Sequence, residues 1–319
     1  MPTADLQFPS LADLEAAHRR ILPMLLPTPL LAARSVEAAL WLKPENLQRT
    51  GSFKFRGAYH KLTRLTPKAR ARGVVAYSSG NHGQAVACAA QLYGCPATIV
   101  MPQDAVREKV EGVLRYGARI IACEGGSDER RRIAEELAAT DGLEIVPPYD
   151  DLEIVMGQAS VGLEIARERR EVRQILVPVG GGGLLSGVGL AARALLPGVR
   201  IIGVEPAGAD DLYRSIQSGE HVRLARVDTL ADGLRTQSVG DLNYAILREV
   251  VDEVVTVSEE EILEAVRTLL LAEKLLVEPS GAVAFAAFQA GKVPRDVETA
   301  AVLSGGNISQ DVLHSIIKR

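Results

Sequence analysis

The sequence is poor in aromatic residues and cysteine, and it contains no long apolar run. Phe, Trp and Tyr make up 4% of the 319 residues, while 47% are hydrophobic and 24% charged, a composition typical of a globular enzyme or binding protein. No apolar stretch reaches the roughly 18 residues of a membrane span. The N-terminus lacks the charged start and apolar core of a signal peptide. We therefore expect a cytoplasmic protein that does not bind a membrane.

Cysteine is also too scarce for a disulfide framework. The three cysteines, Cys88, Cys95 and Cys123, are odd in number and form no C-x-x-C pair. This spacing suggests neither structural disulfides nor a zinc site, so we expect buried free thiols.

Positive charge is not in excess. Lys and Arg number 36 against 40 Asp and Glu, which gives a net charge of -4. No basic surplus draws the chain to nucleic acid or to anionic lipid, so a small anionic ligand would need a local site. The length predicts two domains of about 150 residues each.

Short β-branched runs alternate with amphipathic stretches along most of the chain. Runs of this kind begin near residues 74, 97, 118, 174, 200, 253 and 300. The alternation predicts an α/β fold with parallel sheets and crossover helices on their faces. Residues 73–149 hold several strands of their own. We expect them to form a small domain inserted into a large discontinuous one, residues 1–72 plus 150–319.

Four of the expected strands end in polar or glycine-rich turns. The turns are "SSGNHG", "GGGG", "EPAGADD" and "SGGN". Open α/β sheets bind ligands at the carboxyl ends of their strands, so we expect the four turns to line one crevice.

The run Gly180–Gly183 lies between an expected strand and an expected helix. Its backbone N-H groups can surround an anion, and the helix N-terminus adds partial positive charge, so we interpret it as a phosphate cradle. No Lys-Ser/Thr follows, which excludes a Walker loop. A dinucleotide fingerprint would need a third glycine where Ser186 stands.

The segment "SFKFRG" places Lys54 between two phenylalanines. Such a lysine either reaches out to water or is held inside for a reason. The turns at Ser78–Gln84 and Ser304–Asn307 can each be simple turns, and His82 a hydrogen-bonding spacer. Taken together with the phosphate cradle, however, they fit pyridoxal phosphate, whose aldehyde, phosphate, O3' and ring nitrogen need these four kinds of partner.

At this point the sequence resembles a known family, the fold-type II pyridoxal phosphate enzymes, in its serine racemase and threonine dehydratase branch. The motifs that carry the resemblance span nearly the whole chain in the order "PENLQRTGSFKFRGA", "SSGNHGQAVA", "GQASVGLEI", "VGGGGLLSG", "VEPAGADD", "ADGLRT", "LLVEPSGA" and "SGGN". The resemblance implies two parallel-sheet α/β domains, as in the tryptophan synthase β fold, with the cofactor in the cleft between them.

The resemblance also implies cofactor residues. Lys54 corresponds to the Schiff-base lysine, Asn81 to the partner of O3', Gly180–Gly183 to the phosphate loop and Ser304 to the partner of the pyridine nitrogen. Phe53 would lie against the cofactor. A hydroxyl partner does not hold the ring nitrogen protonated, which disfavours transamination and leaves β-elimination or return of the proton.

By the same resemblance, the first polar turn binds the substrate. Ser78, Ser79, Asn81 and His82 would surround the substrate carboxylate, and Ser79 occupies the position from which serine racemase protonates the opposite face of the α-carbon. Lys54 would remove the α-proton as a neutral amine. The expected reaction is deamination of L-serine or L-threonine to pyruvate or 2-oxobutyrate plus ammonia, with serine racemisation permitted.

The turn "VEPAGADD" resembles a divalent cation site of the serine racemase branch. Glu205, the carbonyl of Ala209 and Asp211 would supply hard oxygen ligands to Mg²⁺, Ca²⁺ or Mn²⁺. The alternative is an acidic turn that caps a helix.

Several alternatives remain open. Tyr149 stands where serine racemase has an asparagine and threonine dehydratases an aromatic residue. Arg130 matches an arginine that reaches dicarboxylates in serine racemase, which makes threo-3-hydroxyaspartate dehydration an alternative, and serine racemisation could be the main reaction. β-Replacement, a nicotinamide-dependent oxidoreductase and a non-catalytic amino-acid sensor fit the residues less well. The family leads us to expect a homodimer.

Overall fold

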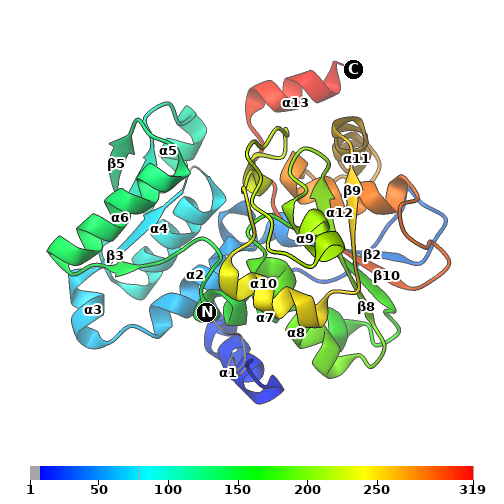
Figure 1. Ribbon diagram of the computed structural model, residues 1–319, viewed down its shortest axis with the longest axis horizontal. Helices are drawn as coiled ribbons and strands as arrows, with labels where there is room; N and C mark the ends of the chain where they lie inside the picture. Colours follow the sequence, from blue (N-terminus) through cyan, green and yellow to red (C-terminus); the bar gives the residue numbers. More distant parts are fainter. Residues whose placement is uncertain (1–7, 79, 319) are drawn as a thin grey trace.

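Two open sheets lie next to each other in the computed structural model, which describes residues 8–78 and 80–318 (Figure 1). The larger sheet has the strand order β1-β2-β10-β7-β8-β9 and the smaller one the order β5-β4-β3-β6. All strand pairs are parallel except β1 with β2. The expected α/β fold with parallel sheets is confirmed.

Seven of the strands were predicted from the β-branched runs. The large sheet consists of β1 (Leu31–Ala32), β2 (Leu40–Pro44), β7 (Gln174–Pro178), β8 (Arg200–Pro206), β9 (Glu253–Val257) and β10 (Thr299–Leu303). The small sheet consists of β3 (Val74–Tyr77), β4 (Ala97–Pro102), β5 (Arg119–Cys123) and β6 (Glu144–Ile145). Strands β1, β2 and β6 were not predicted, because β1 and β6 have only two residues each and β2 ("LWLKP") has no β-branched residue.

Helices connect the strands and cover the sheet faces. They are α1 (Leu11–Ile21), α2 (Lys54–Thr63), α3 (Pro67–Arg72), α4 (Asn81–Tyr93), α5 (Arg107–Leu114), α6 (Ser127–Asp141), α7 (Leu152–Glu168), α8 (Gly183–Leu195), α9 (Asp211–Ser218), α10 (Asp241–Val250), α11 (Glu259–Leu271), α12 (Pro279–Gln289) and α13 (Gln310–Ile317). Short 3₁₀ turns are η2 (Leu22–Met24), η3 (Glu45–Leu47), η4 (Arg49–Gly51) and η5 (Asp232–Leu234).

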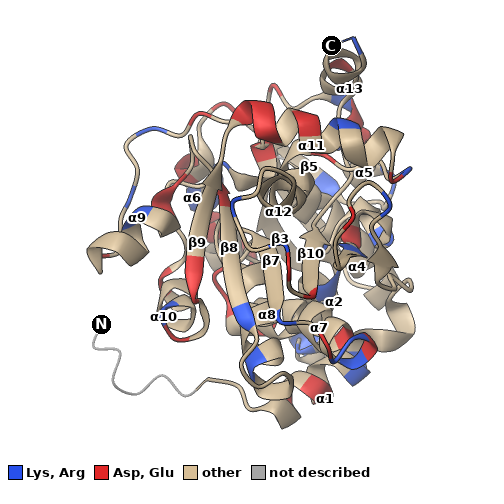
Figure 2. Cartoon of the chain, turned by 90° about the vertical axis from the view of Figure 1, so that its right-hand side faces the viewer, with Lys and Arg blue, Asp and Glu red and all other residues tan. Residues whose placement is uncertain are grey.

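The core of the large sheet has two sides. Helix α12 has the sequence "PSGAVAFAAFQ" without a single charge, and it packs with α11 in one apolar cluster (Figure 2). Helices α7 and α8 pack in the other cluster, where glycines at 157, 162 and 187 let helix backbones approach closely. Helices therefore cover both faces, as buried parallel strands require.

Helix α2 packs on both sides, against α4 of the small sheet and, with Gly57 beside Gly157, against α7. Phe55, Ala58 and Leu62 lie in one apolar cluster with Val74 of β3 and Val86 of α4. All four strands of the small sheet fall within residues 73–149, yet this helix precedes residue 73. The boundaries of the inserted domain remain a prediction, and below we call β3–β6 with α4–α6 the small unit and the large sheet with its helices the large unit.

Two further expectations concern thiols and membranes. Cys88, Cys95 and Cys123 are buried free thiols, as expected. Across residues 8–78 and 80–318, no helix has the length and apolar character needed to cross a membrane.

Candidate active site

The polar turns meet where the two units face each other. Strands β10, β7 and β8 are neighbours in the large sheet, so their carboxyl ends share one edge. The turn after β3 reaches this edge from the small unit, because Asn307 Nδ2 donates to Asn81 Oδ1 at 2.7 Å. Residues that are more than 200 positions apart in sequence thus form one site.

Lys54 is the first residue of α2 and points into this junction. Its Nζ donates to the carbonyl oxygen of Pro148 at 2.6 Å and lies 5.1 Å from the centre of the Phe53 ring. Burial lowers the pKa of Lys54 to about 8. The backbone N-H of Phe53 donates to the carbonyl of Ser304 at 3.1 Å, which ties the start of α2 to the turn after β10. Lys54 is half-buried, and its amine is held by the backbone at the junction.

The glycine run forms an open cradle at the start of α8. Gly182 has a φ of 89°, a left-handed conformation that favours glycine, and α8 has no side-chain cap at its N-terminus. A Cβ on Gly181 would lie 2.2 Å from the ring of Tyr149. The first N-H groups of α8 are therefore left for an anionic partner.

The turn after β3 leads into α4. Ser78 Oγ accepts from the N-H of Gly80 at 3.1 Å, and Asn81 is the first residue of the helix. His82 is buried with Nε2 2.8 Å from the carbonyl of Val146, and burial together with the charge of Lys54 lowers its pKa to about 3. A neutral imidazole fixed in this way matches the spacer interpretation, and its contact with substrate stays a prediction. Ser79 lies outside the described residues.

Ser304 follows β10 directly. Its side chain is buried, and Oγ donates to the carbonyl of Ser280 over a long 3.4 Å. The hydroxyl therefore lies at the same sheet edge as the glycine cradle, one strand away.

Comparison with known proteins accounts for this arrangement. Residues 21–305 match the family model described as pyridoxal-phosphate dependent enzyme. The chain belongs to this family. The match covers far more than half of the sequence and confirms the family inferred from the motifs.

Several proteins are similar to this chain over nearly its whole length. The L-threo-3-hydroxyaspartate ammonia-lyase of Saccharomyces cerevisiae is 41% identical and covers 94% of each chain. The serine racemase of Arabidopsis thaliana is 42% identical over 93% of this chain and 92% of its own. Threonine deaminase isoform 2 of Solanum lycopersicum superposes with a TM-score of 0.90 at 33% identity, covering 100% and 95%.

The residues present fit pyridoxal phosphate. The cradle at Gly180–Gly183 offers uncapped backbone donors for a phosphate, and the half-buried Lys54 with its lowered pKa faces the same junction. Asn81 and Ser304 supply an amide and a hydroxyl at the adjoining turns.

The expected cation ligands lie close together beside the site. Glu205 Oε1 and Oε2 accept from the N-H groups of Leu212 and Tyr213 at 3.0 and 2.7 Å, and Asp211 Oδ2 accepts from Val239 at 2.7 Å. Ala209 between them is buried. Within the described residues, no group of three or more His, Cys, Asp or Glu side chains is arranged for a metal ion. The bonds that Glu205 accepts from Leu212 and Tyr213, in the first turn of α9, match the alternative of an acidic side chain that caps a helix.

The two carboxylates nevertheless lack charge compensation. Burial, and then the charge of Asp211, raise the pKa of Glu205 well above its ordinary range. Burial raises the pKa of Asp211 to about 7, and its Oδ1 is buried without a hydrogen-bond partner. A pair of this kind is stabilised either by a proton or by a cation.

Arg130, which is predicted to contact the substrate, and the next residue, Arg131, have different environments. Arg130 Nη1 donates to the carbonyl of Gly125 at 3.3 Å within its own loop and helix. Arg131 lies near Tyr77 and Tyr149, and its charge lowers the pKa of both phenols against the raising effect of burial. The contact of Arg130 with the substrate remains a prediction.

The sequence analysis missed three charged residues at the junction. Glu278 accepts from Asn81 Nδ2 at 2.5 Å, and Lys109 of α5 pairs with Asp232 of η5. Glu278 lies in "LLVEPSGA" and Asp232 in "ADGLRT". These motifs carried the family resemblance, but the sequence did not predict a role for either carboxylate. Lys109 gave no signal at all, since it lies on an ordinary amphipathic helix.

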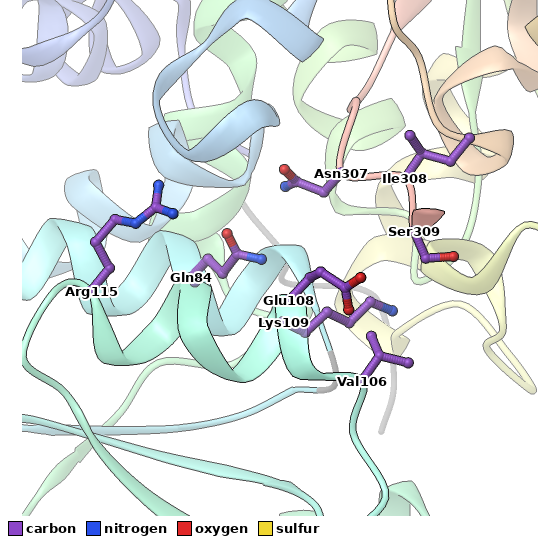
Figure 3. Close-up of a pocket in the computed structure, with 9 residues that line it drawn as sticks. Gln84, Val106, Glu108, Lys109, Arg115, Asn307, Ile308 and Ser309 are labelled. Carbon is purple, nitrogen blue, oxygen red and sulfur yellow. The ribbon is translucent and has the colours of Figure 1, made fainter. Parts of the chain in front are cut away.

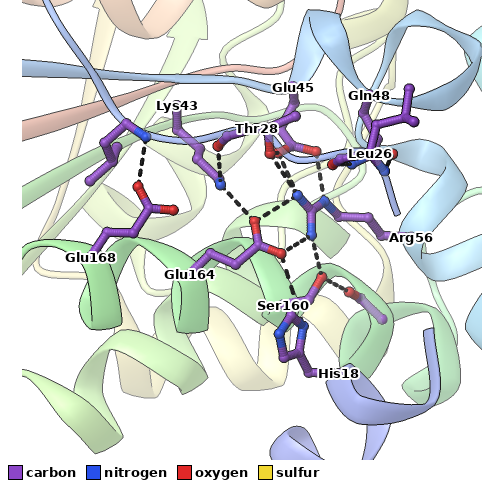
Figure 4. Close-up of polar contacts among 12 residues, drawn as sticks. His18, Leu26, Thr28, Lys43, Glu45, Gln48, Arg56, Ser160, Glu164 and Glu168 are labelled. Atoms are coloured by element: carbon purple, nitrogen blue, oxygen red, sulfur yellow. Dashed lines mark hydrogen bonds and ion pairs between the residues drawn. The ribbon is translucent and has the colours of Figure 1, made fainter. Parts of the chain in front are cut away.

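A buried ionic network holds the helix that carries Lys54 (Figure 4). Arg56 is fully buried and donates to both oxygens of Glu45 at 2.7 Å and to Glu164 at 2.7 and 2.8 Å. Lys43 Nζ also donates to Glu164, at 2.6 Å. Two cations, Arg56 and Lys43, thus balance two carboxylates, Glu45 and Glu164. Arg56 lies two residues after Lys54.

A hollow with a volume of about 180 Å³ separates the two units on one side of the site (Figure 3). Gln84, Lys109 and Arg115 line it from the small unit, and residues 307–309 line it from the large unit. The units are therefore joined by a few polar contacts there and not by continuous apolar packing.

Proposed function

We propose that this enzyme deaminates β-hydroxy amino acids, L-serine or L-threonine, to the corresponding 2-keto acid and ammonia. The observation that carries the proposal is the buried amine of Lys54, whose pKa is lowered to about 8 in a junction lined by a phosphate cradle. Relatives that act on threonine, serine and hydroxyaspartate, as their names state, support it.

Pyridoxal phosphate, when bound, withdraws electrons from the α-carbon of an attached amino acid. Lys54 then removes the α-proton, and its lowered pKa raises the neutral fraction at pH 7 from about one in 3,000 to about one in ten. Ser304 would hold the ring nitrogen without adding a charge, and the glycine cradle would bind the phosphate. The β-hydroxyl leaves as water, and a water molecule is taken up when ammonia is released, so the net products are keto acid and ammonia.

The test is keto acid release by the purified enzyme with L-serine, D-serine, L-threonine and threo-3-hydroxyaspartate in parallel. Pyruvate and 2-oxobutyrate are expected from the L-amino acids, and none from Lys54→Ala. If no keto acid forms from any substrate although wild type binds the cofactor, the deamination proposal is wrong.

Hydroxyaspartate dehydration is the second candidate. It is favoured by the position of Arg131 near Tyr77 and Tyr149, because a guanidinium at that edge can pair with a second carboxylate. Arg131→Gln should then raise KM for threo-3-hydroxyaspartate much more than for L-serine, whereas Arg130→Gln should affect both equally.

Serine racemisation stays within the proposal as a side reaction. It requires a proton donor on the face of the α-carbon opposite Lys54, the role expected of Ser79. Ser79→Ala should abolish D-serine formation and retain pyruvate formation. Chiral chromatography of the reaction mixture measures both.

We further propose that Glu205, the carbonyl of Ala209 and Asp211 bind Mg²⁺, Ca²⁺ or Mn²⁺. The support is the buried carboxylate pair, with its raised pKa values and the unpartnered Oδ1 of Asp211. Added Mg²⁺ should raise the unfolding temperature of chelator-treated wild type but not of Asp211→Asn. An equal shift in both would place the ion elsewhere.

We further propose a homodimer in the cytoplasm, and the family resemblance is its support. Light scattering on the purified protein measures the mass, and a single-chain value would exclude the dimer.

A further inference from the structure

Asn81 stands at the contact between the two units with its carboxamide engaged from both sides. Its Nδ2 donates to Glu278 Oε1 at 2.5 Å, and its Oδ1 accepts from Asn307 Nδ2 at 2.7 Å. Asn307 Nδ2 also donates to the carbonyl of Thr50 at 2.7 Å, so both of its amide hydrogens are in use. These contacts leave one hydrogen on Asn81 Nδ2 for another acceptor.

The orientation of this carboxamide depends on Glu278. An amide rotated by 180° would place Nδ2 of Asn81 against the amide donor of Asn307 and Oδ1 against the carboxylate of Glu278. Both pairings are repulsive, because each joins two donors or two acceptors. An acceptor at position 278 therefore selects the orientation in which Nδ2 of Asn81 faces Glu278 and Oδ1 faces Asn307.

The backbone around Glu278 is shaped to bring its carboxylate to Asn81. The N-H of Glu278 donates to the carbonyl of Gly305 at 3.1 Å, and the residue lies immediately before α12. A Cβ on Gly305 would lie 2.2 Å from Glu278 Oε1 and 3.1 Å from Asn81 Nδ2. A glycine at position 305 is thus necessary for the contact.

This carboxylate is maintained against an energetic cost. Glu278 is buried, and burial and then the charge of Asp232 raise its pKa to about 7. The hydrogen bond from Asn81 and the charge of Lys109 act in the opposite direction. An apolar residue would avoid this cost, so the contact with Asn81 is the evident reason for an acid here.

We propose that Glu278 is a positioning residue that fixes the Asn81 carboxamide across the junction, so that its remaining N-H is aimed at O3' of the cofactor. The inference rests on the proposed role of Asn81. Glu278 itself has no proton-transfer step in this proposal, and no other group changes its covalent state.

The decisive variant is Glu278→Met, which removes the acceptor while keeping a side chain of similar length. We expect the dissociation constant for pyridoxal phosphate to rise about 10- to 100-fold, the effect of one oriented hydrogen bond to a charged acceptor. The visible absorption band of the bound cofactor should shift, because its O3' loses a donor. Glu278→Gln, whose carbonyl can still accept, should recover most of the affinity and of the band position.

A second variant reaches the same contact without changing any charge. Gly305→Ala displaces the carboxylate from Asn81 and should reproduce the shifted band. Glu273→Gln serves as the matched control, because Glu273 is another buried acid, five residues earlier, which accepts from the backbone of Arg34 and Ser35. It should leave both the band and the cofactor affinity unchanged.

The outcomes separate the two levels of the argument. If Asn81→Ala shifts the band and Glu278→Met leaves it within the error of wild type, with affinity within twofold, Glu278 is only structural and the inference is wrong. If Asn81→Ala has no effect on the band, the role of Asn81 fails. If Lys54→Ala keeps the wild-type band, the cofactor linkage itself fails.

Discussion

Single residues at the junction owe their chemistry to burial. Lys54 is an ordinary lysine by sequence, yet its amine has the pKa of a weaker base because desolvation disfavours its charged form. The neutral amine is the form that can attack an aldehyde or take a proton.

The first prediction follows from this pKa. Attachment of pyridoxal phosphate to the apoenzyme should accelerate as pH rises and level off above about 8, because the neutral fraction of Lys54 grows through its lowered pKa. Stopped-flow absorbance from pH 6 to 10 measures it. A rate that still rises steeply at the upper end, toward the ordinary lysine value of 10.5, would contradict the lowered pKa.

Gly181 matters because its missing side chain leaves room for the Tyr149 ring. Gly181→Ala should displace the Tyr149 ring and weaken cofactor binding at least tenfold, because the added Cβ would lie 2.2 Å from the ring. Equilibrium dialysis of pyridoxal phosphate measures the loss. Gly126→Ala is the control, since a Cβ there meets no atom within 4 Å; equal losses in both would show that the cradle tolerates the methyl group.

At the scale of elements, α2 transmits the large unit's geometry to Lys54. Its start is tied to the turn after β10, where Ser52 also forms a β-bridge with Gly305. Its first turn is held by Arg56, which the sequence placed only as part of a family motif. The structure explains why an arginine lies two residues after the lysine.

Breaking this network should destabilise the fold. Arg56→Met leaves Glu45 and Glu164 buried without their main partner and should lower the free energy of unfolding by about 3–5 kcal/mol. Urea denaturation measures it. Arg64→Ala removes an exposed pair at the other end of the same helix and should cost about 1 kcal/mol or less. Similar losses in both variants would argue against the network.

The same network predicts a pH dependence. The cations Arg56 and Lys43 lower the pKa of Glu164 to about 2, despite its burial, from an ordinary value of 4.5. A carboxyl with a lowered pKa stabilises the fold above its unfolded value, and this contribution is lost as pH falls from about 4.5 through 2. The stability difference between wild type and Arg56→Met should shrink in that window; a constant difference would contradict it.

At the scale of the whole molecule, the site exists only while the two units stay together. Lys109 of the small unit pairs with Asp232 of the large unit beside the hollow, and both side chains are partly exposed. Salt therefore screens the pair. We expect release of pyridoxal phosphate from wild type to accelerate with ionic strength and release from Lys109→Met to be fast and nearly independent of salt.

The control for this prediction lies on the same helix. Arg107 pairs with Glu111 within α5 and does not reach the large unit, so Arg107→Ala should keep the wild-type response to salt. Cofactor fluorescence after dilution measures each release rate. An unchanged salt response in Lys109→Met would exclude the pair as a contact that holds the units together.

Much of this protein follows from its sequence alone. The β-branched runs predicted seven of the strands, because buried parallel strands need continuous apolar residues. The glycine run, Lys54, Asn81 and Ser304 were predicted as cofactor residues from the turns next to strand ends and from the family resemblance, and the structure brings these turns to one junction. Residue type and position next to a strand are local properties, so a short stretch of sequence is enough to predict them.

Only the tertiary structure decided what depends on distance. Asn81 contacts Glu278 and Asn307, and Lys109 pairs with Asp232, although these partners lie far apart in the chain. Arg130 and Arg131 are adjacent in the chain, yet their environments differ. The lowered pKa of Lys54 likewise comes from burial by segments that no local pattern connects to it. Hydrogen bonds and desolvation act through space, so the fold had to be known before they could be assigned.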